Sequence, residues 1–189
     1  MWRFEEQGGE WKDKIKAKGI ETVRRDWCDL TSETLKTCLE MILKQGNTSG
    51  ALALSRETIG KIRAMDLQKD RDILPKITLT KKYGRAIESY KQKQPHIQLI
   101  KKLQQRGMLD YGIGDRIPYI IVRRSKKTQF VDRAEDPQYA IAHGDQIDAQ
   151  YYIDKQILPP LSRLFGALGV EEDKLKYNHT QSRLCNAYA

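Results

Sequence analysis

The segment from Asp148 to Gly169 constrains the fold more than any other part of this 189-residue chain. Its apolar residues recur with helical period, at Tyr152, Ile153, Ile157, Leu161, Leu164, Phe165 and Leu168. Asp148 suits the N-cap of such a helix, and Gly169 suits its end. Because Pro159 and Pro160 lack backbone N–H groups, we predict a kink or a break at these two residues.

Three further segments have helical period. The first begins with Thr31 or Ser32 as N-cap, ends at Gly46 and places on one face Leu35, Leu39, Ile42 and Leu43. The second opens at the turn NTSG, runs to about Met65 and buries Leu52, Ile59 and Ile62. The third begins at Pro95, ends at Gly107 and buries Ile97, Ile100 and Leu103. The chain is therefore expected to be mainly helical.

Extended segments are short and few. Residues 2–17 suit two strands joined by a glycine-containing hairpin loop. Ile77 and Leu79 alternate with threonines after Pro75 and predict another extended segment, and residues 117–122 predict a strand. The fold class is thus α+β, with helices predominating.

Composition excludes several classes of protein. Charged residues make up 31% of the chain, and no apolar run approaches the roughly 20 residues that a membrane span needs. The N-terminal residues lack the pattern of a signal or transit peptide, so no export is expected. Cys28, Cys38 and Cys185 are odd in number and lack C-x-x-C spacing, which indicates reduced thiols in a cytoplasmic protein.

The positive charge is concentrated in residues 76–106. This basic block holds nine lysines and arginines and one acid, Glu88, and so carries +8 of the net charge of +9. A merely solvated helix face usually mixes both signs, whereas this block does not. A helix N-terminus at Pro95 and His96 adds backbone N–H groups that suit a phosphate. We therefore expect binding to nucleic acid that weakens as salt rises.

Catalytic and metal-binding patterns are missing from the sequence. His96, His143 and His179 are far apart and lack metal-ligand spacing, so each is expected to be a solvated or capping residue. Glu21, Asp26 and Asp29 could hold a divalent ion, but they alternate with arginines that compete for them. An ion-pair network is the favoured interpretation of these acids.

Residues 18–27, KGIETVRRDW, provide the link to a known family. The segment resembles a motif of family B DNA polymerases that lies at the end of the palm, just before the thumb. Later segments resemble the thumb of the same family in the same order, namely T-K, S-Y-K, P-H-I-Q-L, K-K-L-Q-Q-R-G, G-D-R-I-P-Y-I-I-V, D-R-A and D-A-Q-Y-Y-I-D-K-Q-I-L-P-P-L. The agreement extends over most of residues 11–170 and resembles the archaeal members of the family.

The resemblance implies particular DNA contacts. Lys18, Arg24 and Arg25 match positions that contact primer and template, and Lys81, Lys82 and His96 match positions that hold the duplex backbone. With the neighbouring cations, the expected DNA-binding set is Lys18, Arg24, Arg25, Lys81, Lys82, Arg85, Lys93, His96, Lys101, Lys102 and Arg106. Lys101, Lys102 and Arg106 are expected on the side of the third helix away from its buried residues. Glu21 and Asp26 would hold the arginine forks in place, and Trp27 would anchor the segment to the first thumb helix.

Two features depart from the family's pattern near the basic block. Many archaeal members have glycine where this chain has Gln94, and the spacing between Lys82 and Tyr90 is slightly long. The register of the DNA contacts within residues 80–94 therefore stays open.

The family's catalytic motifs are absent from these 189 residues. The aspartates of D-x-x-S-L-Y-P and Y-G-D-T-D, which bind two metal ions in the family, do not occur, and neither does K-x-x-x-N-S-x-Y-G. We therefore expect no cofactor on this chain and Mg²⁺ on a catalytic partner. The favoured hypothesis is the small subunit of a split DNA polymerase, with an expressed fragment as the other interpretation.

The C-terminal residues carry a second, weaker motif. Gln181, Leu184 and Tyr188 fit the spacing of a sliding-clamp-binding peptide, although Ala187 replaces one aromatic residue. Residues 171–189 otherwise lack periodicity and are expected to form a flexible tail.

These observations predict three parts: a palm hairpin with its motif in residues 1–30, a thumb in 31–170 and the tail. The hairpin would complete the palm of a large catalytic polypeptide, and primer–template DNA would be the ligand of a nucleoid-associated protein. Two alternatives stay open, an autonomous nucleic-acid-binding module and an assembly protein.

Overall fold

The computed structural model describes residues 2–7, 10–15, 27–108 and 110–176. The described residues outside the N-terminal hairpin form two compact units. The helical unit contains residues 31–62 and 153–176, and the sheet unit contains residues 27–30 and 63–152. No helix of the described residues has the length and apolar character that crossing a membrane would need.

The N-terminal hairpin consists of strand β1 (Trp2–Gln7) and strand β2 (Glu10–Ile15). The strands are antiparallel, with Trp2 opposite Ile15 and Gln7 opposite Glu10. This register confirms the two-stranded hairpin that the sequence predicts.

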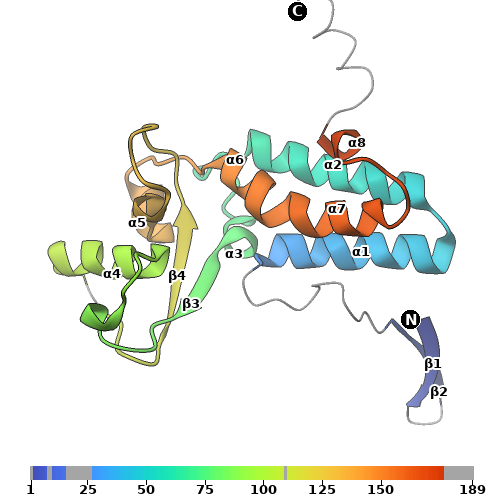
Figure 1. Ribbon diagram of the computed structural model, residues 1–189, viewed down its shortest axis with the longest axis horizontal. Helices are drawn as coiled ribbons and strands as arrows, with labels where there is room; N and C mark the ends of the chain where they lie inside the picture. Colours follow the sequence, from blue (N-terminus) through green and yellow to red (C-terminus); the bar gives the residue numbers. More distant parts are fainter. Residues whose placement is uncertain (1, 8–9, 16–26, 109, 177–189) are drawn as a thin grey trace, which may run out of the picture. The chain divides into compact units, whose positions relative to one another are not determined.

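The helical unit is built from α1 (Asp29–Gln45), α2 (Thr48–Ala64), α7 (Leu158–Gly166) and the short α8 (Glu172–Lys176) (Figure 1). Gly46 has φ +63°, a left-handed conformation that suits glycine after the end of a helix. Asn47 then caps α2, because its Oδ1 accepts a hydrogen bond from the Gly50 amide at 2.8 Å. The predicted N-cap of the first helix was wrong, since α1 already begins at Asp29.

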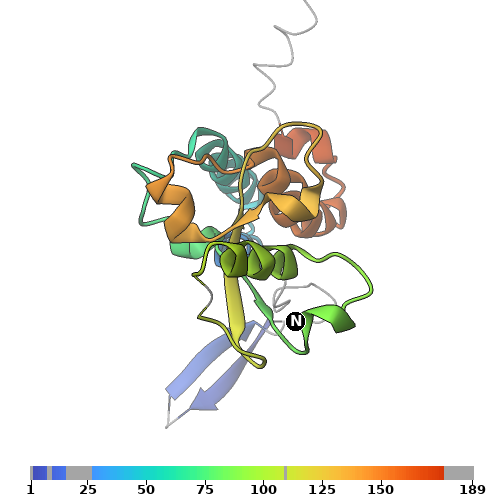
Figure 2. The same ribbon diagram turned by 90° about the vertical axis from the view of Figure 1, so that its left-hand side faces the viewer.

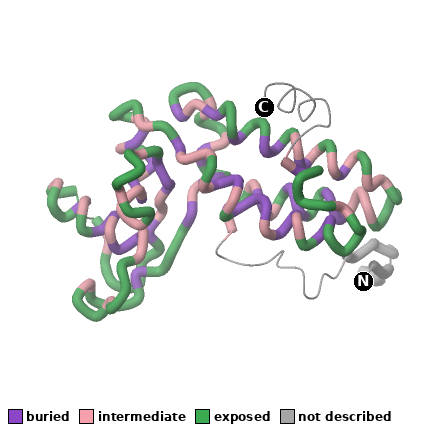
Figure 3. Tube along the Cα trace, turned by 45° about the horizontal axis from the view of Figure 1, so that its top comes forward, coloured by how far each residue is buried: buried purple, intermediate pink, exposed green. Residues whose placement is uncertain are grey.

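The core of the helical unit lies between the facing sides of these helices (Figure 3). Leu35 and Leu39 of α1 are buried as predicted, but Cys38 completes the buried stripe and Leu43 is 41% exposed. Cys38 lies against α2, where its thiol donates to the Ala51 carbonyl at 3.4 Å. Residues 171–189 were expected to form a flexible tail, but residues 172–176 form helix α8, which buries Leu175.

The sheet unit is organised around three antiparallel strands in the order β3 (Leu79–Lys82), β4 (Arg116–Ile121) and β5 (Ala134–Glu135). The strand predicted at residues 117–122 is confirmed within one residue at each end. The segment before β3 is not extended throughout, since α3 (Leu74–Ile77) makes one helical turn at Pro75. Proline suits the first turn because its missing N–H would have no partner there.

Helix α4 (Pro95–Gln105) lies crosswise over the sheet (Figures 1 and 2). It buries Ile97, Ile100 and Leu103 as predicted, and Gly107 follows its end with φ +68°. The unit also contains the 3₁₀ turns η1 (Ile87–Ser89) and η2 (Phe130–Arg133) and helix α5 (Pro137–Ala142).

The last long helix of the sequence prediction changes helix type just before Pro159 and Pro160, where a kink or break was expected. Asp148 caps α6 (Ala149–Tyr151) by accepting from the Tyr151 amide at 3.1 Å. The chain then forms a π-helical segment, η3 (Tyr152–Ile157), and returns to α-helix at Leu158 just before Pro159 and Pro160. A π-helical segment is one of the known causes of a kink in a helix.

Candidate nucleic-acid interface

The predicted cations of the sheet unit arise from three neighbouring elements. Lys81 and Lys82 lie on β3, Arg85 and Lys93 lie in the segment before α4, and Lys101 lies on α4 itself; all five are exposed. Within the described part of the chain, Lys82, Lys91 and Lys101 have no acidic partner within salt-bridge distance. These exposed side chains can therefore meet an external anion without breaking an ion pair.

Strand pairing brings two of the cations directly opposite each other. In the β3–β4 register, Lys82 pairs with Arg116, so two exposed cations point from adjacent strands. Like charges that face each other across a strand pair destabilise a sheet, which makes the pair unfavourable without a counter-anion. Arg116 also donates to the Thr80 hydroxyl at 3.4 Å. Arg116 is not among the residues predicted from the sequence to bind DNA, because only the register of β3 against β4 places it opposite Lys82.

The segment that leads into α4 is held by an aromatic residue. The hydroxyl of Tyr90 accepts a hydrogen bond from the Gly84 amide at 3.1 Å, and the Arg85 guanidinium lies 5.4 Å from the Tyr90 ring centre. These contacts limit the freedom of a segment that also carries Lys91 and Lys93. The exposed cations are thus presented from a fixed turn as well as from a strand.

His96 differs from the predicted solvated or capping residue. Its side chain is only 2% exposed, and its ring meets the Tyr90 ring edge-on at 5.9 Å between centres. Among the described residues, its buried Nε2 has no hydrogen-bond partner. Burial, together with the charge of Lys81, lowers the pKa of His96 to about 4, so the ring is neutral at pH 7.

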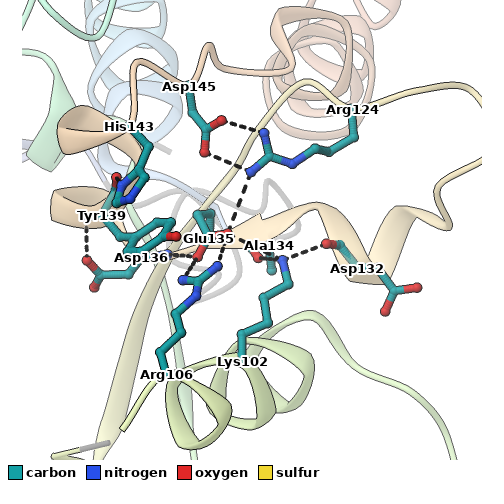
Figure 4. A network of polar contacts seen from close by, with 10 residues as sticks. All are labelled: Lys102, Arg106, Arg124, Asp132, Ala134, Glu135, Asp136, Tyr139, His143 and Asp145. Atoms are coloured by element: carbon teal, nitrogen blue, oxygen red, sulfur yellow. Dashed lines mark hydrogen bonds and ion pairs between the residues drawn. The ribbon is translucent and has the colours of Figure 1, made fainter. Parts of the chain in front are cut away.

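Lys102 and Arg106 lie in a polar network with Glu135, not beside Lys101 in solvent (Figure 4). Arg106 donates from both terminal nitrogens to the Glu135 carboxylate, at 2.8 and 3.1 Å. Lys102 donates to the carbonyls of Asp132 and Ala134, each at 2.7 Å, and lies 3.5 Å from the same carboxylate. The expectation that both side chains point away from the packed side of α4 was wrong, because a buried carboxylate on β5 attracts them.

Glu135 is the centre of this network. Its side chain is 1% exposed, and Arg124 approaches it as a third cation at 3.6 Å. Burial raises the pKa of Glu135, but the hydrogen bond from Arg106 and the charge of Lys102 outweigh burial and lower the pKa overall. The carboxylate therefore remains ionised and its charge is shared among three cations. No sequence pattern indicates this role, because Glu135 stands next to Asp136 in a strand of only two residues.

The outer part of the network involves a second carboxylate and two rings. Arg124 forms a two-pronged ion pair with Asp145, and its hydrogen bond holds the pKa of Asp145 below the ordinary value. The Arg106 guanidinium stacks 3.6 Å from the centre of the Tyr139 ring, which in turn stacks on His143. Such planar contacts and forked hydrogen bonds fix the arginines within the unit.

Several predicted site residues lie outside the described residues. They are Lys18, Glu21, Arg24, Arg25, Asp26, Gln181, Leu184 and Tyr188. Trp27 is described and half-buried, and its buried indole Nε1 has no hydrogen-bond partner in the described part of the chain. Across those same parts, no cluster of histidine, cysteine or acidic side chains could hold a metal ion.

Comparison with known proteins identifies the family. The sequence profile described as DNA polymerase family B matches residues 4–168. The chain is 35% identical over 178 residues to the DNA polymerase delta catalytic subunit of Drosophila melanogaster, and 34% identical over 173 residues to that of Oryza sativa subsp. japonica. Each match covers 90% of this chain and 15% of the relative. The chain thus belongs to DNA polymerase family B and spans about 15% of the length of these relatives.

A solved structure agrees with this assignment. The family B DNA polymerase from the hyperthermophilic archaeon Pyrobaculum calidifontis superimposes with a TM-score of 0.63 and 28% sequence identity. The superposition covers 77% of this chain and 18% of that polymerase. The mainly helical α+β fold with its small antiparallel sheet is therefore a family B polymerase fold.

Proposed function

We propose that this chain is the small DNA-binding subunit of a split, archaeal-type family B DNA polymerase. Its helical and sheet units together would form the thumb, in residues 31–170, and hold the primer–template duplex. The β1–β2 hairpin would complete the palm of a large catalytic polypeptide. That polypeptide would hold the Mg²⁺ ions on its carboxylates and carry out nucleotidyl transfer.

The observation that carries the proposal is the set of exposed cations on β3, β4 and the segment before α4. Lys82 and Arg116 face each other without a carboxylate between them, and Lys91 and Lys101 add further charge. Cations that replace the counterions of phosphates bind DNA without regard to sequence, which suits a polymerase that moves along its template. Membership of the polymerase family makes duplex DNA the natural polyanion.

The predicted palm-end residues extend this role. Lys18, Arg24 and Arg25 would contact primer and template near the primer end, with Glu21 and Asp26 holding the arginines and Trp27 anchoring the segment. The tail, through Gln181, Leu184 and Tyr188, would bind a sliding clamp. Such a protein would act at the nucleoid.

Primer extension tests the proposal. The large catalytic polypeptide is assayed on a primed template with and without this chain, over a range of salt concentrations. We expect synthesis to depend on the chain and to become more sensitive to salt in a Lys82→Gln/Arg116→Gln variant. Equal synthesis with and without the chain would reject the subunit role. A large polypeptide that remains bound after deletion of residues 1–17 would reject the docking role of the hairpin.

A further inference from the structure

A second group of exposed cations follows β4, outside the basic block. Residues 123–128 form a loop with the sequence RRSKKT, in which Arg123, Lys126 and Lys127 are exposed. The six residues include no acid, and none of these three side chains has an acidic partner among the described residues. The loop is therefore an unneutralised basic surface of its own.

The ends of the loop are fixed to the sheet unit. At its start, Val122 bridges to Ile147, and the Arg123 amide donates to the Gln146 carbonyl at 2.7 Å. Near its end, the Thr128 amide donates to Ser125 at 3.0 Å, closing a turn around Lys126 and Lys127. The Arg133 guanidinium then donates to the Thr128 carbonyl at 3.2 Å. Because both ends are held, an anion would meet cations that are already positioned.

Two of the acids close to the loop, Asp145 and Asp148, are already paired, whereas Asp132 in η2 forms no ion pair among the described residues. Asp145 accepts both terminal nitrogens of Arg124, and Asp148 accepts from Arg133 at 2.8 Å. Glu135 is buried among its own cations. The three exposed cations of the loop therefore cannot be neutralised by these three paired carboxylates without breaking existing pairs.

The loop also adjoins the basic block. The Lys93 ammonium donates to the Gln129 side chain at 3.4 Å, which brings the segment before α4 beside the end of the loop. Arg116 is the first residue of β4, and Lys82 of β3 lies opposite it. Loop 123–128 lies beyond the other end of β4, which ends at Ile121. Six strand residues extend about 20 Å, which corresponds to about six base pairs of duplex axis. The cations are thus spaced over a length on which DNA presents many phosphates.

We propose that loop 123–128 is a second contact surface for the phosphate backbone of the duplex, with Lys126 and Lys127 as its principal cations. This inference rests on the proposed DNA-binding function and adds a site outside the basic block. Loop 66–72 shows how a merely solvated charged loop differs. Its Lys69 and Arg71 alternate with Asp66, Asp70 and Asp72, and Lys69 lies 3.7 Å from Asp66. A loop with both positive and negative side chains, such as loop 66–72, is typical of a solvated surface. A loop with positive side chains alone, such as loop 123–128, attracts a polyanion.

The test measures binding of the full chain to a labelled primer–template duplex by fluorescence anisotropy at several salt concentrations. We expect Lys126→Gln/Lys127→Gln to reduce the slope of log affinity against log salt by about 2, one for each lost phosphate contact. The matched control, Lys69→Gln/Arg71→Gln, changes the net charge equally and should retain the wild-type slope. Thermal unfolding of each variant verifies that it is folded.

A third variant separates this inference from the proposed function. If Lys82→Gln/Arg116→Gln weakens binding while the loop variant behaves like its control, the loop is not a DNA contact and the proposed function stands. If neither variant weakens binding, both the inference and the proposed function fail. A loss in both, with an unchanged control, supports both.

Discussion

Two cation-rich regions of the sheet unit show how the same side chains serve different purposes. In the open region, Lys82 and Arg116 face each other in solvent without an acid between them. In the closed region, Lys102, Arg106 and Arg124 surround the buried carboxylate of Glu135. The position of a carboxylate, and not the number of cations, separates the two regions. Charge that is paired inside a protein stabilises a conformation, whereas unpaired charge at the surface remains available to a ligand.

The comparison predicts that the closed region matters most for stability. Replacing Glu135 by glutamine keeps the shape of the side chain but leaves three partly buried cations without their shared anion. We expect the free energy of unfolding to fall by about 3 kcal/mol, as when one partner of a buried ion pair is removed. Urea unfolding measures this change. Glu57→Gln is the control, because its ion pair with Lys61 is 59% exposed on both sides and should contribute less than about 1 kcal/mol.

The same variant has an expected pH signature. Because the folded protein lowers the pKa of Glu135, the carboxylate stabilises the fold above its ordinary pKa. This stabilisation disappears as the pH falls through the lowered pKa. The difference in stability between wild type and Glu135→Gln should therefore shrink in acid. A difference that stays constant down to the lowest pH would show that the charge of Glu135 is not its contribution.

His96 tests the distinction between the open and closed regions. It lies within the basic block in the sequence, but its side chain is buried, unlike the exposed cations of the open region. Its folded pKa of about 4 lies below the ordinary value of 6.5, so the unfolded chain binds a proton more readily. Stability should therefore decline as the pH falls from 6.5 toward 4, by roughly 3 kcal/mol in total.

The measurement is urea unfolding at a series of pH values for the wild type and for His96→Leu. The variant lacks the titrating group and should lose less stability between pH 6.5 and about 5, above the range in which carboxylates titrate. Parallel curves for the two proteins would mean that His96 protonates in the folded state as readily as in the unfolded state. Glu57→Gln should retain the full decline in this range.

Much of the fold could be predicted from the sequence because its signals are local. Periodicity and terminal residues placed α2 and α4 close to their observed positions. The break expected at Pro159 and Pro160 is instead a π-helical segment that ends just before them. The start of α1 was misplaced, since Thr31 and Ser32 are good cap residues but the helix continues back to Asp29. The prediction placed Ile77 in an extended segment, but Ile77 ends the helical turn α3. Alternation over only four residues is too short to distinguish a strand from one helical turn.

The candidate site was less predictable, because its division into two regions depends on distant residues. The sequence places Lys101 and Lys102 together, yet only the pairing of β5 with β4 positions Glu135 to attract one of them. Arg116 likewise becomes part of the open region only through its register with Lys82. Counting charges along the chain locates a basic block but cannot show which of its cations are already paired.

The open region should matter for DNA binding and little for stability. Lys82→Gln/Arg116→Gln removes the like-charge pair from the sheet and would remove the two proposed phosphate contacts. We expect the salt slope of duplex binding to fall by about 2, and the free energy of unfolding to change by less than about 1 kcal/mol. Salt-dependent anisotropy and urea unfolding measure the two quantities. A large loss of stability with an unchanged slope would reverse the roles assigned to the two regions.

The smallest predicted effect is the most discriminating, because it compares two adjacent lysines. Lys101 is exposed and without an acidic partner among the described residues, whereas Lys102 donates to two carbonyls and approaches Glu135. Lys101→Gln should reduce the salt slope by about 1 without destabilising the fold. Lys102→Gln should leave the slope unchanged and lower the stability, since Glu135 and both carbonyls lose a charged donor. Equal effects of the two substitutions on either measurement would show that α4 does not separate an open side from a closed one.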